Sequence, residues 1–372
     1  MTEAARPIEA PIIIFAFDRA AYLKRFCDSL KAQQGVELDP QRIYLLQDGP
    51  VSHRSGVRYA DDAAMAESIA AFREVFPAGQ VLASADNLGI AFNIRRGEQL
   101  AFETLGAETA YFFEDDLELG PGYMLMMERM RALLAPFPEV GYFAAYGDHR
   151  ATPDPDRVRI VPLDHHWGFG LRRDAWKRLQ EWLAPYFAIL SKTDYQSRNH
   201  IGVYRWLEGQ AMAIDKSSQD ALKALACANL GIARVMTDMC FARYIGEKGA
   251  SFNERRFREM GYDRMTPTER SDLPIEPQTV EKIRTITEGQ QAHFRVFRER
   301  EFNGFMTRYA ARNWDSERAV TRADIDNLYS LLLDRLPEGE HIYDQYVGKT
   351  PVRRLRDIMI NSREFRGRTR RD

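Results

Sequence analysis

Three consecutive carboxylates, Glu114, Asp115 and Asp116, follow directly after the apolar run 110–113. Carboxylate oxygens are the hard ligands that Mg²⁺ and Mn²⁺ prefer. A solvated acidic turn is the ordinary interpretation of such a triplet. The apolar run instead predicts a strand buried on both faces, and three anions at its carboxyl end need a compensating cation. We therefore expect a metal and diphosphate site at Glu114–Asp116.

Other polar residues also follow short apolar runs. The residues are Arg19, Asp48 and Asn87, and the runs span residues 12–17, 43–46 and 80–83. Helical patterns separate the runs, so the first half reads β-α-β-α-β-α-β, which is typical of a parallel sheet with helices on both faces. Because right-handed crossovers place such strand ends on one edge, we expect all these polar side chains to line one crevice.

Two stretches of the second half carry further candidates. Asp220 begins the helix-forming stretch 221–230, where its ordinary role is that of an anion stabilised by the helix dipole. The stretch 164–173 holds two adjacent histidines, an aromatic residue and two glycines. Adjacent residues seldom face the same ion, so we favour a flexible loop that packs an aromatic ring over a sugar or base. The helix that follows is expected to end near Pro185.

The composition sets limits on partners and compartment. The chain has 372 residues, 45% hydrophobic and 28% charged, with a formal net charge of -2. These values are typical of a soluble globular protein and disfavour nucleic acid as a partner. The three cysteines show no zinc-type spacing. No signal peptide and no run long enough to cross a bilayer is evident, so we expect a cytoplasmic protein, with peripheral membrane association left open.

The expected fold is α/β, a mostly parallel, Rossmann-like sheet flanked by helices and followed by a C-terminal all-α region. We place a catalytic domain at residues 1–260, a charged linker and helical extension at 261–316, and a small helical domain at 317–372. One long helix is expected over residues 280–311. The charged segment 253–277 is a candidate lid over a bound ligand.

Several common nucleotide-binding motifs are absent from the sequence. No Gly-x-Gly-x-x-Gly follows the first expected strand, and no Gly-Lys-Ser/Thr phosphate loop is present. The expected sheet edge offers carboxylates where a phosphate loop would offer glycines and a lysine. A nucleotide diphosphate at this edge would therefore be held through a metal.

Taken together, these segments resemble a glycosyltransferase of the GT-A fold. The similarity is to the N-acetylglucosaminyltransferase I type and to bacterial relatives near glycosyltransferase family 2, and it covers about residues 11–252. The segments that carry it are Pro11–Arg19, Leu45–Asp48, Asn87–Gly89, Phe113–Glu118 and Trp167–Trp176.

The resemblance implies a nucleotide-sugar donor, a divalent metal (Mn²⁺ or Mg²⁺) and inversion at the anomeric carbon. It implies that Asp116 binds the metal and that Asp220 is the catalytic base. The nucleotide-sugar-binding residues that it implies are Phe17, Arg19, Asp48, Asn87, Glu114, Asp115, Trp167 and Gly168. Two departures stand out: Ser251-Phe252 replace an expected histidine, and Gln219 and Ala221 replace aromatic residues beside the base.

The implied function is transfer of a sugar, with N-acetylglucosamine among the candidates, from a UDP-sugar to a hydroxyl group. The acceptor would be a glycan, a lipid-linked molecule or a protein, in bacterial surface glycan or glycoconjugate synthesis. The last residues resemble a small helical domain of unknown function, through which a homo-oligomer could form. Two alternatives stay open: a metal-dependent nucleotidyltransferase, and a non-catalytic nucleotide- or carbohydrate-binding module.

Overall fold

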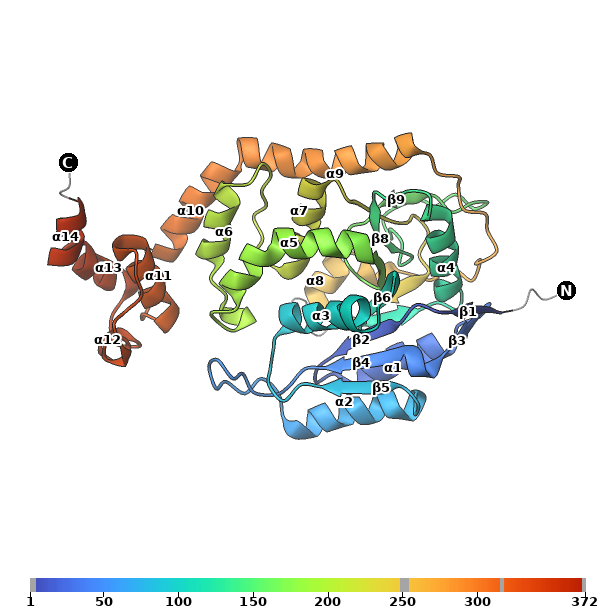
Figure 1. The fold of residues 1–372 in the computed structure, drawn as a ribbon, viewed down its shortest axis with the longest axis horizontal. Helices are drawn as coiled ribbons and strands as arrows, with labels where there is room; N and C mark the ends of the chain where they lie inside the picture. The colour runs from blue at the N-terminus through green and yellow to red at the C-terminus, as the bar shows by residue number, and fades with distance from the viewer. Residues whose placement is uncertain (1–4, 248–253, 315–317, 370–372) are drawn as a thin grey trace. The chain divides into compact units, whose positions relative to one another are not determined.

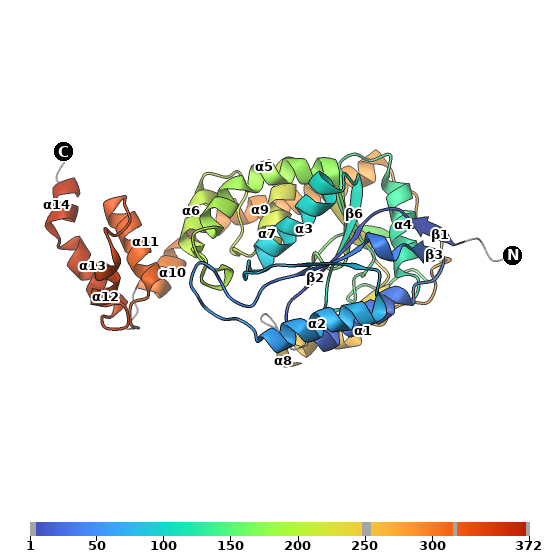
Figure 2. The ribbon, with the colours of Figure 1, turned by 60° about the horizontal axis from the view of Figure 1, so that its bottom comes forward.

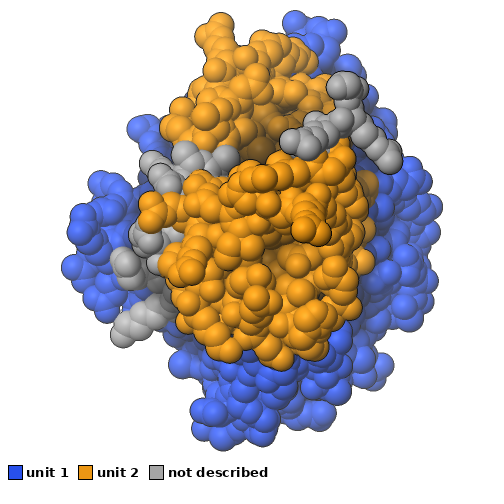
Figure 3. All heavy atoms as spheres, turned by 90° about the vertical axis from the view of Figure 1, so that its left-hand side faces the viewer, with its two compact units in different colours: residues 1–184, 194–196, 218–293 blue, residues 185–193, 197–217, 294–372 orange. Residues whose placement is uncertain are grey.

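The computed structural model describes residues 5–247, 254–314 and 318–369. The chain divides into two compact units (Figure 3). The first covers residues 1–184, 194–196 and 218–293, and the second covers residues 185–193, 197–217 and 294–372. The expected domain boundaries at 260/261 and 316/317 stay predictions.

The first unit is built on a mixed β-sheet, which has eight strands in the described part of the chain (Figure 1). Four strand pairings are parallel and three are antiparallel, because β10 and β9 run against their neighbours. The expected α/β class with a central sheet flanked by helices is confirmed. In spatial order the strands are β5 (Gln80–Ala83), β4 (Ile43–Gln47), β2 (Ile12–Ala16), β6 (Thr109–Glu114), β10 (Phe169–Arg172), β8 (Val140–Ala144), β11 (Ala233–Thr237) and β9 (Ile160–Pro162).

Helices cover both faces of the sheet, which explains why β6 is apolar on both sides. Phe112 of β6 contacts Phe102, which follows α3, whereas the next residue, Phe113, contacts Phe26 of α1. Successive side chains of a strand point to opposite faces. In Figures 1 and 2, α1 and α2 lie on one side of β2, β4 and β5, and α3 lies on the other. The helices are α1 (Ala20–Lys31), α2 (Asp62–Val75) and α3 (Ile90–Gln99), the last continued by a π-helical turn at Leu100–Thr104.

Shorter elements complete the first unit. Two small sheets pair β1 with β3 in parallel and β7 with β12 in antiparallel fashion. Helices α5 and α9 contribute residues to both units. The elements are β1 (Arg6–Ile8), β3 (Val36–Leu38), β7 (Leu117–Leu119), β12 (Ala242–Tyr244), α4 (Tyr123–Leu134), α5 (Arg173–Leu190), α7 (Gln219–Leu230), α8 (Glu254–Glu259) and α9 (Val280–Arg300).

Two sequence-based expectations are wrong at this level. The stretch 164–173 is not all loop, because its second half is β10 at the centre of the sheet. Gly170 permits this placement, since a Cβ there would lie 2.4 Å from Cζ of Phe143. The helix expected to end near Pro185 runs on to Leu190. The carbonyl that Pro185 leaves without an N–H partner belongs to Glu181, an exposed residue, where water can serve as donor.

The second unit is helical, and its C-terminal part confirms the expected all-α region. The expected single helix over 280–311 is instead two helices, α9 and α10, separated at Glu301. Within residues 5–247, 254–314 and 318–369, no helix combines the length and apolar character needed to cross a bilayer. The helices of this unit are α6 (His200–Glu208), α10 (Phe302–Trp314), α11 (Arg322–Leu333), α12 (Glu340–Tyr346), α13 (Val352–Ile360) and α14 (Arg363–Thr369).

Candidate active site

The strand directions bring the predicted polar residues to one edge of the sheet. Strands β5, β4, β2 and β6 are mutually parallel, so their carboxyl ends share that edge. Strand β10 is antiparallel to β6 and begins there, directly after Trp167 and Gly168. Helix α7 precedes β11, a strand whose carboxyl end lies at the same edge, so the residues that begin α7 also lie there. Asp220 is among them.

Arg19 joins the end of β2 to the acidic triplet. Its Nε lies 3.2 Å from Oδ2 of Asp115, and its Nη2 donates to Asp115 Oδ1 and, at 3.0 Å, to Asp116 Oδ2. Burial acts to lower the pKa of Arg19, but the two aspartates outweigh it and raise that pKa. Burial raises the pKa of Asp115 to about 7, against the opposing effect of Arg19. The cation that the triplet needs is therefore partly supplied by the chain itself.

Asp116 is buried and is held by the segment that follows β12. Its carbonyl accepts a hydrogen bond from Ile245 N at 2.8 Å, and its Oδ2 lies 3.5 Å from the hydroxyl of Tyr244. A Cβ on Gly246 would stand 2.9 Å from the same Oδ2, so only glycine fits there without a shift. Burial raises the pKa of Tyr244, and Asp116 and Glu114 add to the effect. Tyr244 therefore stays a neutral hydroxyl beside the carboxylate.

Asp48 and Asn87 lie together, but their polar groups are already engaged with the loops around them. Oδ1 of Asp48 accepts the N–H groups of Gly49 and Leu88 at 2.9 and 2.8 Å, and Oδ2 accepts the N–H of Gly89 at 2.9 Å. Asn87 Nδ2 donates to the carbonyl of Gly49 at 2.9 Å and lies 3.4 Å from Asp48 Oδ2. In this geometry Asp48 fixes the loop after β4 to the turn that begins α3.

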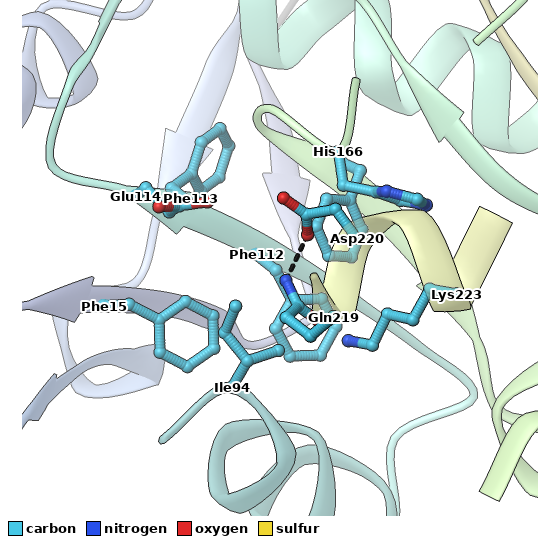
Figure 4. A pocket seen from close by; sticks show the side chains of 10 residues that line it. Phe15, Ile94, Phe112, Phe113, Glu114, His166, Gln219, Asp220 and Lys223 are labelled. Carbon is cyan, nitrogen blue, oxygen red and sulfur yellow. Dashed lines mark hydrogen bonds between the residues drawn. The ribbon is translucent and has the colours of Figure 1, made fainter. Parts of the chain in front are cut away.

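Glu114 and Asp220 line one small cavity, shown in Figure 4. Its volume is about 10 Å³, roughly the room that one water-sized group needs. Asp220 is exposed to solvent and Glu114 is half-buried. Desolvation raises the pKa of Glu114 well above its usual range, and the charges of Asp116 and Asp220 add to this. Although part of the residue is open to solvent, desolvation of its carboxyl group raises the pKa of Asp220 to about 6, against Lys223 and Arg234, which lower it.

The start of α7 is held from two directions. The N–H of Gln219 donates to the hydroxyl of Tyr195 at 3.0 Å, and its side-chain Nε2 donates to Oδ1 of Asp220. Asp194, the residue before Tyr195, accepts hydrogen bonds from the hydroxyls of Ser52 and Tyr59, the latter at 2.7 Å. The loop after β4 and the first turn of α7 are therefore tied to the same short segment, 194–196.

The remaining predicted residues surround this site. Trp167 stacks on Tyr244 and on His165, with ring centroids 4.2 and 4.4 Å apart, so protein rings cover both faces of the indole. Within the described residues, the edge of Trp167 is the part left for a ligand. Gly168 has φ +49°, and a Cβ on it would lie 2.6 Å from Leu117. The carbonyl of Phe17 accepts from Gln47 Nε2 at 2.7 Å, which fixes the chain after β2.

A divalent cation fits the chemistry of this site only in part. Asp116 offers a carboxylate oxygen of the kind that Mg²⁺ or Mn²⁺ binds. That oxygen, Oδ2, is shared with Arg19, so a cation there would compete with the guanidinium. Among the residues whose placement is described, no three His, Cys, Asp or Glu side chains form a ready-made metal cage. The predicted replacement of a metal-binding histidine by Ser251-Phe252 lies outside the described residues.

Sequence reasoning missed several residues of this site. Tyr244, Glu98 and Lys223 carry no motif, and they join the site only because the sheet order brings their elements together. His166 was considered only as a metal ligand, and its place beside the cavity was not expected. His166 is buried and lines the cavity, and desolvation lowers its pKa well below the usual value, so the ring is neutral. The one signal available was the adjacency of His166 to the Trp167-Gly168 pair.

Comparison with known proteins gives structural likeness alone. No family model matches the chain, and no curated protein matches it. Among the solved structures that match is a fragment of S. aureus TarS, with 12% identity, a TM-score of 0.37, and coverage of 80% of this chain and 74% of that chain. Another is an active-site mutant of LgtC, with 14% identity, a TM-score of 0.29, and coverage of 70% of this chain and 98% of that chain. A third is the mannose-1-phosphate geranyltransferase from Thermus thermophilus, with 12% identity, a TM-score of 0.32, and coverage of 61% of this chain and 72% of that chain.

TarS and LgtC are glycosyltransferases. Against a longer TarS chain the match covers 52% of that chain, so this protein spans about half its length. With identities of 14% or less and TM-scores below 0.5, these likenesses carry no argument about what this chain does.

Proposed function

We propose that this protein is a metal-dependent, inverting glycosyltransferase that moves a sugar from a UDP-sugar to a hydroxyl group of an acceptor. One observation carries the proposal. Asp220, open to solvent and with a pKa raised to about 6, faces the same cavity as Glu114 at the sheet edge where Arg19, Asp115 and Asp116 gather. A base near neutral pH and a charged site for a diphosphate are the two components that glycosyl transfer needs.

In the proposed reaction, Asp220 is the base that acts on the acceptor. An acceptor hydroxyl loses its proton as its oxygen bonds to the anomeric carbon, and a carboxylate within hydrogen-bond reach takes that proton. Above pH about 6 Asp220 is ionised and able to do so. The cavity of about 10 Å³ beside it has room for a single hydroxyl oxygen. One direct displacement of this kind inverts the anomeric carbon.

The residues that would bind the nucleotide-sugar donor are those of the triplet Glu114–Asp116 and the loops around it. Mn²⁺ or Mg²⁺ held through Asp116 would neutralise charge on the leaving diphosphate. Arg19 orients Asp115 and Asp116, and Asp48 and Asn87 shape the loops at the same edge. We place the nucleotide-sugar against Phe17, Glu114 and the edge of Trp167-Gly168. The proposed setting is cytoplasmic, with a glycan, lipid-linked or protein acceptor.

The decisive experiment replaces Asp220 by Asn and measures UDP release from a panel of UDP-sugars with Mn²⁺. We expect kcat to fall by roughly 10²–10⁴-fold while UDP binding by calorimetry stays within a few-fold, because the lost contact belongs to the transition state. The matched control is Asp62→Asn, which removes a first-turn carboxylate from another helix, α2, where it is exposed.

Each outcome of this experiment separates one function from another. Equal UDP release by the Asp220→Asn and Asp62→Asn variants would reject the proposal. Asp220 would then be only an anion that interacts with the dipole of α7. Pyrophosphate release from a nucleoside triphosphate and a sugar phosphate, with no UDP-sugar turnover, would establish the nucleotidyltransferase alternative instead. UDP-sugar binding without turnover of any substrate would establish a binding module.

A further inference from the structure

A buried ion pair lies beneath the cavity and has no part in the mechanism above. The ammonium group of Lys223 on α7 donates to Oε1 of Glu98 on α3, and the two residues are 3% and 0% exposed. Gln180 Nε2 lies 3.3 Å from the other oxygen of Glu98. Burying two charges carries a desolvation cost that their attraction must first offset, so such a pair is weak evidence of a stabilising role. Its position therefore needs another explanation.

That position is next to Asp220. Lys223 follows Asp220 by three residues on α7, a spacing that places two side chains on the same face of a helix. Both residues line the cavity, as Figure 4 shows, with Lys223 further along the helix. Lys223 thus lies one helical turn from the proposed base, with its ammonium group held in place by the carboxylate of Glu98.

The other charged and titratable groups around Asp220 come from several elements. On β6 stands Glu114, which is acidic, and before β10 stands His166, which is neutral. On β8 stands Tyr142, whose pKa burial raises, so its hydroxyl is neutral. On β11 stands Arg234, which is 5% exposed and whose Nε and Nη1 make no hydrogen bond within the described residues. Lys223 and Arg234 both lower the pKa of Asp220, and the hydrogen bond from Gln219 acts in the same direction. Two buried cations therefore oppose the desolvation that favours the neutral acid.

We propose that Lys223, anchored by Glu98, is a positioning residue whose fixed charge keeps Asp220 in the ionised form that accepts the acceptor's proton at neutral pH. This inference rests on the proposed role of Asp220 as base. Lys223 does not touch the reacting atoms and acts through Asp220. A purely structural role, in which the pair only ties α3 to α7, predicts a loss of stability with no change in how Asp220 titrates.

The test uses the full chain and the double substitution Glu98→Gln/Lys223→Met. Replacing both members of a buried ion pair costs far less stability than leaving one charge unpaired, so this variant is expected to fold. Lys223→Arg keeps the positive charge and serves as the conservative variant. The matched control is Arg131→Gln, which removes a cation from the buried carboxylate of Glu128 on α4.

The first readout does not depend on activity. The melting temperature of each variant is compared with that of the same variant carrying Asp220→Asn, from pH 3.5 to 8.5. Because the folded state holds the proton of Asp220 more tightly than the unfolded state, the native carboxylate costs stability as pH rises from the unfolded pKa to the folded pKa. The pH at which this difference levels off reports the folded pKa of Asp220. The second readout is the acid limb of kcat/KM for UDP release.

We expect the level-off pH of the stability difference and the midpoint of the acid limb both to move higher by roughly half a unit to one unit in the double variant. Solvent reaches Asp220, so the shift falls short of the roughly 1–3 units expected for a buried charge pair. Lys223→Arg and Arg131→Gln should keep both wild-type values. A double variant whose level-off pH matches that of the wild type overturns the inference, whether or not a sugar is transferred. A raised level-off pH in a protein that turns over no UDP-sugar rejects the proposed function but supports the effect of Lys223 on Asp220.

Discussion

Asp48 matches a nucleotide-binding motif in the sequence, but in the structure its carboxylate holds two loops together. The resemblance assigns it to the nucleotide, but its two carboxylate oxygens accept three main-chain N–H groups in the structure, from Gly49, Leu88 and Gly89. Burial raises the pKa of Asp48, and these hydrogen bonds oppose the rise. The residue thereby holds two loops of the candidate site in register, and a nucleotide contact would be additional.

Replacing Asp48 by Ala should therefore destabilise the protein. The change leaves the N–H groups of Leu88 and Gly89, which are half-buried, without their acceptor, whereas Gly49 N–H keeps the carbonyl of Asp86. We expect this to lower the free energy of unfolding by about 1–3 kcal/mol. Urea unfolding measures it. Asp86→Ala is the control, because Asp86 lies on the adjacent loop with its side chain 56% exposed. A loss for Asp48→Ala no larger than that for Asp86→Ala would show that the loop hydrogen bonds contribute little.

At the scale of elements, the close approach of α3 to the sheet positions the site. A Cβ on Gly97 would lie 2.6 Å from Cε1 of Phe15 and 3.0 Å from Cγ2 of Ile13, both on β2. The helix begins at the Asp48 loop and carries Glu98 near its end. Its distance from the sheet therefore affects both the loop held by Asp48 and the ion pair between Glu98 and Lys223.

Two helical glycines with opposite surroundings test this packing. Gly97→Ala improves helix propensity but overpacks the interface with β2, so we expect a net loss of about 1–3 kcal/mol in the free energy of unfolding. Gly289→Ala in α9 has nothing within 4 Å of the new Cβ and should gain roughly 0.5–1 kcal/mol. Paired thermal melts measure both. Stabilisation by both substitutions would mean that α3 can move away from the sheet at little cost.

At the scale of the whole molecule, the C-terminal helices have a core of their own. Buried residues from α11 and α13 form one apolar cluster, and partly buried side chains of α12 and α14 pack against it. A capping box at Thr321 and Asp324 begins α11. The cluster comprises Val320, Ile325, Leu328, Leu333, Val352, Leu355 and Met359. A self-contained core of this kind predicts that its stability can be changed locally.

Leu328→Ala should loosen this region and spare the sheet. Leu328 is 3% exposed, and truncating a buried leucine costs about 2–5 kcal/mol. We expect faster hydrogen exchange in residues 322–360, with the protection of β2, β4 and β6 and the rate of UDP release unchanged. Leu336→Ala is the control, because Leu336 is 67% exposed. Exchange that also rises in the sheet strands would contradict a separate core.

The local chemistry of the chain was readable from the sequence. Alternating apolar runs and helical patterns predicted the parallel half of the sheet, because burial on two faces leaves a strand apolar throughout and strand direction follows from the connections. The same logic predicted that Arg19 and the triplet Glu114–Asp116 would share an edge. No local pattern could place β10 between β6 and β8 or continue α5 past Pro185, since both depend on neighbours distant in sequence.

Only the tertiary structure decided which groups face which. It paired Arg19 with Asp115 and Asp116, engaged Asp48 with main-chain N–H groups, covered both faces of Trp167, and placed Lys223 with Glu98 beneath Asp220. Residue types specify what a side chain can do, but its partners, its solvent and hence its charge depend on what packs against it. That is why the sequence could name Asp220, and why only the fold could surround it with the charges that set its ionisation.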